Sequence, residues 1–201
     1  KKTLLLSFII LSGLLTNAQT SFYKYVNEPN IASSNFFSCV ATISGYVFAG
    51  SANNLIFDSH LFFARTSTTG SVQQMRSFPA SGYNNFPCVI QTTDGNFGYY
   101  GNELNSSTFI GSLVLLKLDI VGNYLITKTY SDPNYSFTSR KMVQDSQGNF
   151  YLLATASNTQ TLENSICLIK TDPTGTILDQ KLFDPGFDLD AMDIISTAGN
   201  G

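Results

Sequence analysis

The feature that most constrains the fold of this chain is an internal repeat of about 50 residues. A turn glycine recurs at steps of 50, 53 and 51 residues, a second turn glycine at steps of 52 and 53, and a proline at steps of 50, 54 and 52. The first glycines are Gly45, Gly95, Gly148 and Gly199, the second are Gly70, Gly122 and Gly175, and the prolines are Pro29, Pro79, Pro133 and Pro185. Three independent markers with one period indicate copies of a single supersecondary unit.

The segments between these markers also agree. Residues 89–97 resemble residues 142–150, and both end in Gly-Asn-Phe. Residues 115–119 match residues 168–172, and a weaker copy lies at 63–67. The repeat therefore extends to the apolar segments between the turns.

Each unit is predicted to form four short strands. In the clearest copy, Asp172-Pro-Thr-Gly175 is a turn, because proline presets the first turn dihedral and glycine supplies a positive φ. The predicted strands are 141–145, 150–155, 165–170 and 176–183, with a polar loop at 157–163. The chain contains 16 Phe and 10 Tyr but only 12% charged residues, a composition that suits pleated strands. No helical periodicity follows residue 18.

Four strands per unit is the pattern of β-propeller blades. A single four-stranded sheet with two apolar faces cannot bury both, whereas stacked sheets can. A β-sandwich is the alternative, but its sequence has no reason to repeat. We therefore predict an all-β, β-propeller-like array of four-stranded antiparallel blades, with full units at about 37–78, 88–132 and 141–183 and part of a fourth at 191–201.

The segment before the first unit resembles the last strand of a unit. Residues 22–29 match residues 126–133, so we expect 20–29 to be a strand that closes the final blade of a ring. Propellers generally have four to eight blades. With about three units present, we expect an incomplete ring and an N-terminal fragment of a larger protein.

The first 18 residues have the three parts of a secretory signal peptide. Lys1 and Lys2 are positively charged, Leu4 to Leu15 form an apolar segment, and Ala18 precedes the predicted cleavage site. The alternative is a transmembrane anchor, but the apolar segment is shorter than the ~20 residues that a span requires. We expect residues 19–201 to be secreted or displayed at the cell surface, with no membrane span after cleavage.

Charge and cysteine content narrow the possible partners. The net charge is −3 and there is no basic patch, so nucleic acid is not expected as a partner. Cys39, Cys88 and Cys167 are widely spaced and form no C-x-x-C pair. We interpret them as small buried strand residues rather than zinc ligands.

No catalytic constellation emerges from the sequence. His60 is the only histidine, and no G-x-S-x-G motif accompanies it, so we interpret it as a solvated loop residue rather than a base. We predict no catalytic, cofactor-binding or metal-binding residues and no cofactor.

Two sets of aspartates are candidate sites. Asp184, Asp188, Asp190 and Asp193 lack the spacing of a calcium loop and coincide with the connection between units. We interpret them as a solvated connector, with weak calcium binding as the alternative. Asp94, Asp119, Asp145 and Asp172 recur with the repeat, which turn geometry explains better than a single site does.

The repeat resembles a family of repeats found in large secreted proteins of Bacteroidota-type bacteria. The matching residues are 94–97, 115–123 and 168–175. The usual fourth-strand Trp is absent: Leu125 and Ile177 stand near that position, and the chain has no Trp. Kelch and WD40 signatures are absent. The resemblance implies export through the type IX secretion pathway, in which a C-terminal sorting domain is common.

Two functions from different classes remain open. The first is a non-catalytic repeat scaffold or binding and adhesion protein, whose variable loops at 51–60, 102–111 and 157–163 dock a protein or a glycan. The alternative is a propeller-fold enzyme, of the glycoside hydrolase or lyase type, with catalytic groups partly beyond residue 201. Carboxylates or histidines present in single units and facing a central channel would favour the enzyme.

Overall fold

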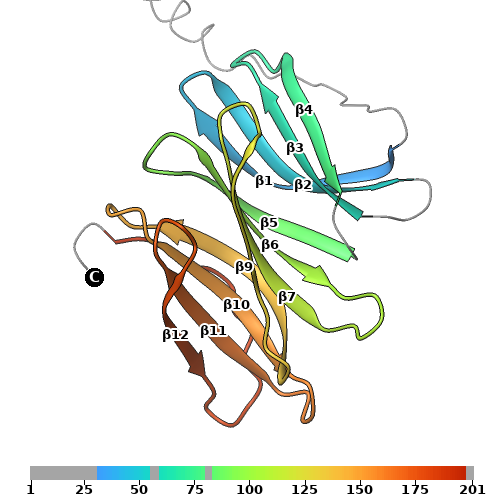
Figure 1. Ribbon diagram of the computed structural model, residues 1–201, viewed down its shortest axis with the longest axis vertical. Helices are drawn as coiled ribbons and strands as arrows, with labels where there is room; N and C mark the ends of the chain where they lie inside the picture. The colour runs from blue at the N-terminus through green and yellow to red at the C-terminus, as the bar shows by residue number, and fades with distance from the viewer. Residues whose placement is uncertain (1–30, 55–58, 80–82, 198–201) are drawn as a thin grey trace, which may run out of the picture.

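The computed structural model describes residues 31–54, 59–79 and 83–197, which form twelve strands and no helix (Figure 1). The strands form three sheets of four, and within each sheet the chain order is also the order of hydrogen-bonded neighbours. All neighbouring strands are antiparallel. Each predicted unit therefore folds into one antiparallel meander.

The three sheets follow the three units of the sequence. Sheet 1 comprises β1 (Ile31–Thr42), β2 (Gly45–Asn54), β3 (Ser59–Thr66) and β4 (Val72–Pro79). Sheet 2 comprises β5 (Tyr83–Gln91), β6 (Phe97–Leu104), β7 (Gly111–Leu118) and β8 (Tyr124–Tyr130). Sheet 3 comprises β9 (Tyr135–Gln144), β10 (Phe150–Asn158), β11 (Asn164–Thr171) and β12 (Ile177–Phe183).

The predicted turn glycines among the described residues all have a positive φ, as expected. Gly148, between β9 and β10, has φ of 85°, and its amide donates to the carbonyl of Asp145. The Asp145 carboxylate accepts hydrogen bonds from the amides of Gln147 and Asn149, both at 2.9 Å. This φ is unfavourable for an L residue with a side chain, so the turn requires glycine at position 148.

The sheets pack face to face in a row (Figure 1). The first strand of each later sheet lies against the preceding sheet: β5 contacts β1, β2 and β3, and β9 contacts β5, β6 and β7. One apolar layer joins sheets 1 and 2, and another joins sheets 2 and 3. The first contains Val47, Ala49, Phe63, Val89, Phe97, Tyr99, Val114, Leu116 and Leu118. The second contains Cys88, Tyr100, Leu113, Leu115, Tyr130, Phe137, Met142, Phe150, Leu152, Ala154, Ala156, Cys167 and Ile169.

The prediction of an all-β fold with four antiparallel strands per unit is confirmed. The first strand of each sheet starts at 31, 83 and 135, whereas the sequence placed the starts near 37, 88 and 141. The pairing register of each first strand shifts midway, between Phe36 and Ser38, between Asn85 and Cys88, and between Ser139 and Lys141. Such a bulge breaks the alternation of apolar residues, so the sequence pattern does not predict the part of the strand before the bulge.

Several predictions concern residues outside the described part. The signal peptide at 1–18 and the closing strand at 20–29 lie there, as do residues 198–201. Residues 191–197, the described part of the predicted fourth unit, form no strand. The described residues include no helix long and apolar enough to cross a membrane.

Candidate functional site

The candidate catalytic and metal-binding residues do not lie together. His60 lies at the start of β3, where its backbone pairs with Ala52 and Pro79. Among the described residues, no group of three or more His, Cys, Asp or Glu could hold a metal ion.

The carboxylates of the 184–193 segment each have a separate partner. Asp188 accepts a 2.9 Å hydrogen bond from the Asn164 amide, and Asp190 lies 3.5 Å from the Arg140 guanidinium. Asp193 lies 3.3 Å from the Lys141 ammonium. These contacts fasten the segment that follows β12 to sheet 3, and they leave no common point for a cation.

The recurring aspartates cap the turns between strands. Asp172 accepts hydrogen bonds from the amides of Thr174 and Thr176 at 2.8 and 2.9 Å, in the same way as Asp145. The Asp119 carboxylate bonds the Val121 and Asn123 amides. Hydrogen bonds from the turns hold the pKa of these carboxylates below the ordinary value. Their role in the turn accounts for their recurrence.

The three cysteines differ from one another in environment. Cys88 and Cys167 are buried, in line with the interpretation as packed strand residues, but Cys39 is exposed on β1. Burial raises the pKa of Cys167 to about 11, which keeps its thiol protonated and unreactive. None of the three forms a disulfide.

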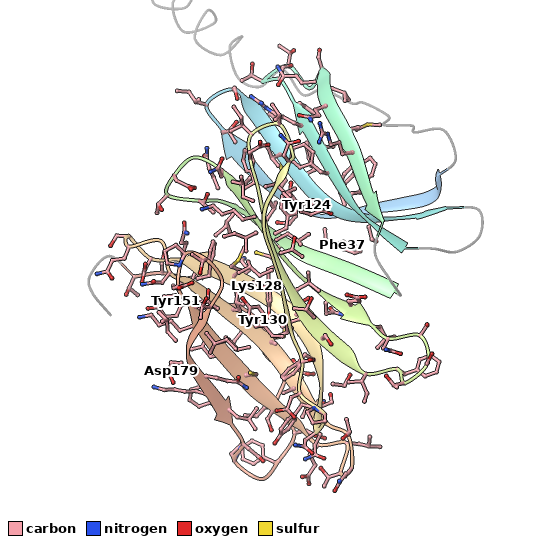
Figure 2. All side chains as sticks on the ribbon, in the orientation of Figure 1. Phe37, Tyr124, Lys128, Tyr130, Tyr151 and Asp179 are labelled. Carbon is pink, nitrogen blue, oxygen red and sulfur yellow. The ribbon has the colours of Figure 1, made fainter. Side chains whose placement is uncertain are left out.

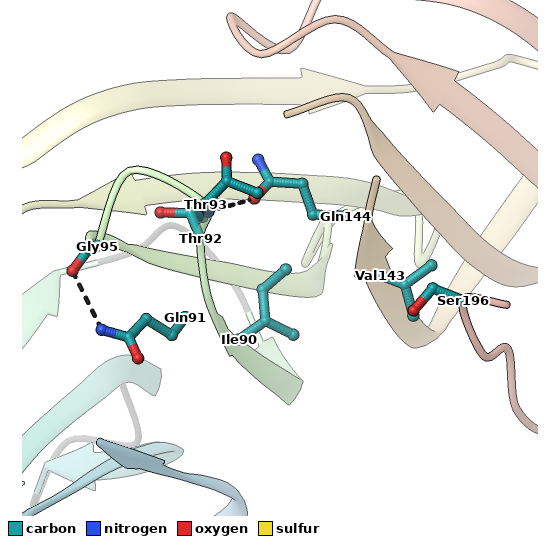
Figure 3. Close-up of a pocket in the computed structure, with 8 residues that line it drawn as sticks. All are labelled: Ile90, Gln91, Thr92, Thr93, Gly95, Val143, Gln144 and Ser196. Atoms are coloured by element: carbon teal, nitrogen blue, oxygen red, sulfur yellow. Dashed lines mark hydrogen bonds between the residues drawn. The ribbon is translucent and has the colours of Figure 1, made fainter. Parts of the chain in front are cut away.

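A shallow pocket of about 550 Å³ lies where the β5–β6 turn meets sheet 3 (Figure 3). Its amide groups already have partners within the protein: the Thr93 amide donates to Gln144 Oε1 at 2.8 Å, and Gln144 Nε2 donates to the Gly148 carbonyl at 2.8 Å. The pocket is lined by Ile90, Gln91, Thr92, Thr93, Gly95, Val143, Gln144 and Ser196. Since this lining has no titratable side chain, it cannot transfer protons but can accommodate a neutral polar group.

Two hairpin loops share one geometry and form the strongest candidate binding surface. In the β6–β7 loop, Asn105 Oδ1 accepts from the amides of Ser107 and Thr108 at 2.9 and 3.0 Å, and the Phe109 amide donates to the Asn105 carbonyl. In the β10–β11 loop, Asn158 Oδ1 accepts from the amides of Gln160 and Thr161 at 2.9 and 3.1 Å, and the Leu162 amide donates to the Asn158 carbonyl.

Each of these loops exposes one apolar side chain in a left-handed conformation. Phe109 has φ of 58° and is 68% exposed, and Leu162 has φ of 63° and is 75% exposed. This conformation costs an L residue about 1–2 kcal/mol. We define Phe109 and Leu162 as the loop tips. Neither side chain belongs to an apolar cluster of the described residues.

The sequence predicted the location of these loops but not their tips. The spacing Asn-x-x-Thr-apolar occurs in both, as Asn105-Ser-Ser-Thr-Phe109 and Asn158-Thr-Gln-Thr-Leu162. This repeated spacing is the signal that could have identified them. Comparison with known proteins finds no family model and no curated relative that matches the chain.

Proposed function

We propose that this chain is an exported, non-catalytic repeat scaffold that binds or adheres through its loops. In this proposal the three sheets are blades of a β-propeller-like array, the chain is the N-terminal part of a larger protein, and the protein is secreted or held at the cell surface. The face-to-face order of three equivalent sheets supports the array.

The observation that carries the binding role is the repeated loop. The same Asn-capped frame displays an exposed apolar tip twice, at Phe109 and at Leu162. Backbone strain and apolar exposure both lower stability, and residues under such strain are concentrated at sites of recognition. The ligand class that we propose is a neutral glycan, because the loop residues 105–110 and 159–163 contain amides and hydroxyls and only one charged side chain, Glu163. A phenyl ring fits the apolar face of a sugar ring, and the amides can bond its hydroxyls.

The test is a double substitution at the loop tips, Phe109→Gly with Leu162→Gly. Glycine tolerates the left-handed conformation, so the variant keeps its fold and gains thermal stability while it loses the tips. Binding of residues 19–201 to an array of neutral oligosaccharides should fall at least tenfold in the variant. The matched control is Val72→Gly with Ile120→Gly, which removes two exposed apolar side chains outside the loops.

Equal binding by the variant and the wild type would contradict a role for the loop tips. Release of reducing sugar ends from the same oligosaccharides would instead support the alternative, a propeller-fold glycoside hydrolase or lyase.

A further inference from the structure

Where two sheets pack together, a basic residue on the last strand of one sheet contacts a turn of the next sheet. Arg76 on β4 pairs in register with Phe63 on β3. The Arg76 guanidinium donates to the carbonyl of Gly122 at 3.4 Å and to Asn123 Oδ1 at 3.1 Å, both in the β7–β8 turn of sheet 2. A Cβ on Gly122 would lie 3.4 Å from Arg76 Cδ and 3.5 Å from the Phe63 ring. A basic residue and its apolar cross-strand partner thus pack against the turn glycine of the next sheet.

Sheets 2 and 3 repeat this contact at equivalent positions. Lys128 on β8 pairs with Leu115 on β7, as Arg76 pairs with Phe63. A Cβ on Gly175, in the β11–β12 turn, would lie 2.7 Å from Lys128 Cγ and 3.4 Å from Leu115 Cδ2. The Tyr130 hydroxyl adds a 2.8 Å hydrogen bond to the Gly175 carbonyl. Lys128 and Tyr130 lie near the centre of the molecule, where β8 meets sheet 3 (Figure 2).

Sheet 3 has the same arrangement, but no sheet within the described residues covers it. Lys181 pairs with Leu168 on β11, and Phe183 pairs with Ile166. Phe183 is 49% exposed, whereas its equivalent Tyr130 is 8% exposed. Leu168 and Ile166 are partly exposed, whereas their equivalents Leu115 and Leu113 are fully buried. We call the face formed by Leu153, Ile166, Leu168, Lys181 and Phe183 the outer face of sheet 3.

The segment that follows β12 lies where the first strand of a next unit is expected. The hydrogen bonds between β9 and sheet 2 include Gly111 N to Ser136 Oγ at 2.8 Å and Ser139 N to Asn102 Oδ1 at 3.4 Å. At equivalent positions, 52 or 53 residues later, Asn164 N donates to Asp188 Oδ1 at 2.9 Å and Ala191 N donates to Thr155 Oγ1 at 3.1 Å. Ala191 is 1% exposed. Residues 187–197 thus approach sheet 3 as β9 approaches sheet 2.

From these equivalences we infer that the outer face of sheet 3 is the docking surface for a fourth four-stranded unit of the same repeat, whose first strand contains residues 187–197. Lys181 and Leu168 receive the turn glycine between the third and fourth strands of that unit. This inference rests on the proposed repeat scaffold and names the partner of its uncovered face.

A second copy of this chain is the competing occupant. The face of sheet 1 that points away from sheet 2 contains Phe48, Phe62 and Met75 in one apolar cluster, and it is equivalent to the faces by which sheets 2 and 3 pack on the preceding sheet. However, residues 188–191 hold the hydrogen-bonding groups that β1 of a second copy would need. A unit continuous with residues 187–197 satisfies both sets of contacts without displacing that segment.

The test extends residues 19–200 with a copy of residues 150–184, so that residues 187–197 provide the first strand of the added unit. Leu168→Cys in the first copy, in a Cys39→Ser background, reports on the outer face through its rate of maleimide labelling. We expect labelling at position 168 to slow at least tenfold in the extended chain. The matched control is Gln180→Cys, which is exposed on the opposite side of β12 and should be labelled at the same rate in both chains.

Equal labelling of position 168 in the folded extended chain would overturn the inference. Failure of the extended chain to fold, when the unextended chain folds, would also overturn it, since the three added strands already pair with one another in sheet 3. The unextended chain could instead form a dimer that becomes monomeric with either Lys181→Glu or Phe62→Asp. That result would assign the outer face of sheet 3 to a second copy. Because the readout is labelling and not oligosaccharide binding, this inference and the proposed function can fail separately.

Discussion

At the residue scale, two turn glycines with nearly the same φ have different surroundings. Gly95 has φ of 80° and no heavy atom within 4 Å of an added Cβ, whereas Gly175 has φ of 79° and an added Cβ would lie 2.7 Å from Lys128 Cγ. The repeat in the sequence predicted the turn role of both glycines. It did not distinguish them, because the close neighbour of Gly175 belongs to another unit.

This difference makes a prediction about the two alanine variants. Gly95→Ala should cost about 1–2 kcal/mol, the penalty for an L residue in this conformation. Gly175→Ala should cost about 1–3 kcal/mol more, because the added methyl forces Lys128 and the contact between sheets 2 and 3 to shift. Chemical denaturation of both variants measures the difference. Equal loss of stability in the two variants would show that Lys128 moves away from the added methyl at little cost.

At the element scale, an ion pair joins the β5–β6 turn to strand β7. Lys117 Nζ on β7 lies 2.7 Å from Asp94 Oδ2 in the turn, and the lysine side chain is only 10% exposed. Burial alone would raise the pKa of Asp94, but hydrogen bonds from Lys117, Thr92 and Asn96 hold it well below the ordinary value. Sheet 3 has a related arrangement, in which the Lys170 ammonium lies 5.1 Å from the centre of the Tyr151 ring.

The lowered pKa of Asp94 predicts that the stability of the protein depends on pH. A carboxylate with a lowered folded-state pKa stabilises the protein above its unfolded pKa of about 3.9, and this contribution is lost as the pH falls toward the folded value. The melting temperature should therefore fall below about pH 4, and Asp94→Asn should flatten that fall while lowering stability at pH 7. Asp119→Asn is the comparison for the turn hydrogen bonds alone: the pKa of Asp119 is also lowered, but without an ion pair to a buried lysine, so this variant should flatten the fall less than Asp94→Asn. A fall of the same steepness in Asp94→Asn would contradict the role of this pair.

The strands themselves show what local sequence can and cannot predict. Strands β10, β11 and β12 lie close to the predicted ranges, because their apolar runs end at Pro, Gly and Asn turns. The first strand of each sheet was predicted five or six residues too short, because a bulge interrupts its pattern.

At the scale of the whole molecule, the middle sheet differs from its neighbours. Sheet 2 contributes side chains to both apolar layers, with Tyr99 in one and Tyr100 in the other, and both are fully buried. Sheets 1 and 3 each contribute to only one of these layers. Stability in stacked repeats is approximately a sum of unit and interface contributions, so a unit with two interfaces is the most stable.

Native-state hydrogen exchange can test this arrangement. The amides of β6 and β7 should exchange most slowly, and those of β4 and β12 fastest among the strands, because local opening there breaks fewer buried contacts. Tyr100→Phe, which removes the 3.1 Å hydrogen bond to the Leu153 carbonyl, should speed exchange in sheet 3 more than in sheet 1. Uniform protection across the three sheets would mean that the array unfolds as a single unit.

The sequence by itself determined the all-β class, the number of strands in each unit and the positions of the turns. These properties depend on local chemistry, such as glycine at a positive φ and aspartate beside exposed amides, and the repeat displays them several times. Only the tertiary structure showed which faces of the sheets are covered, that Lys181 and Leu168 stand where Lys128 and Leu115 receive the next sheet, and that Phe109 and Leu162 project from strained loops. The sequence around a strand residue is the same whether or not another sheet packs against that residue. Its burial between units is therefore decided by residues about 50 positions away.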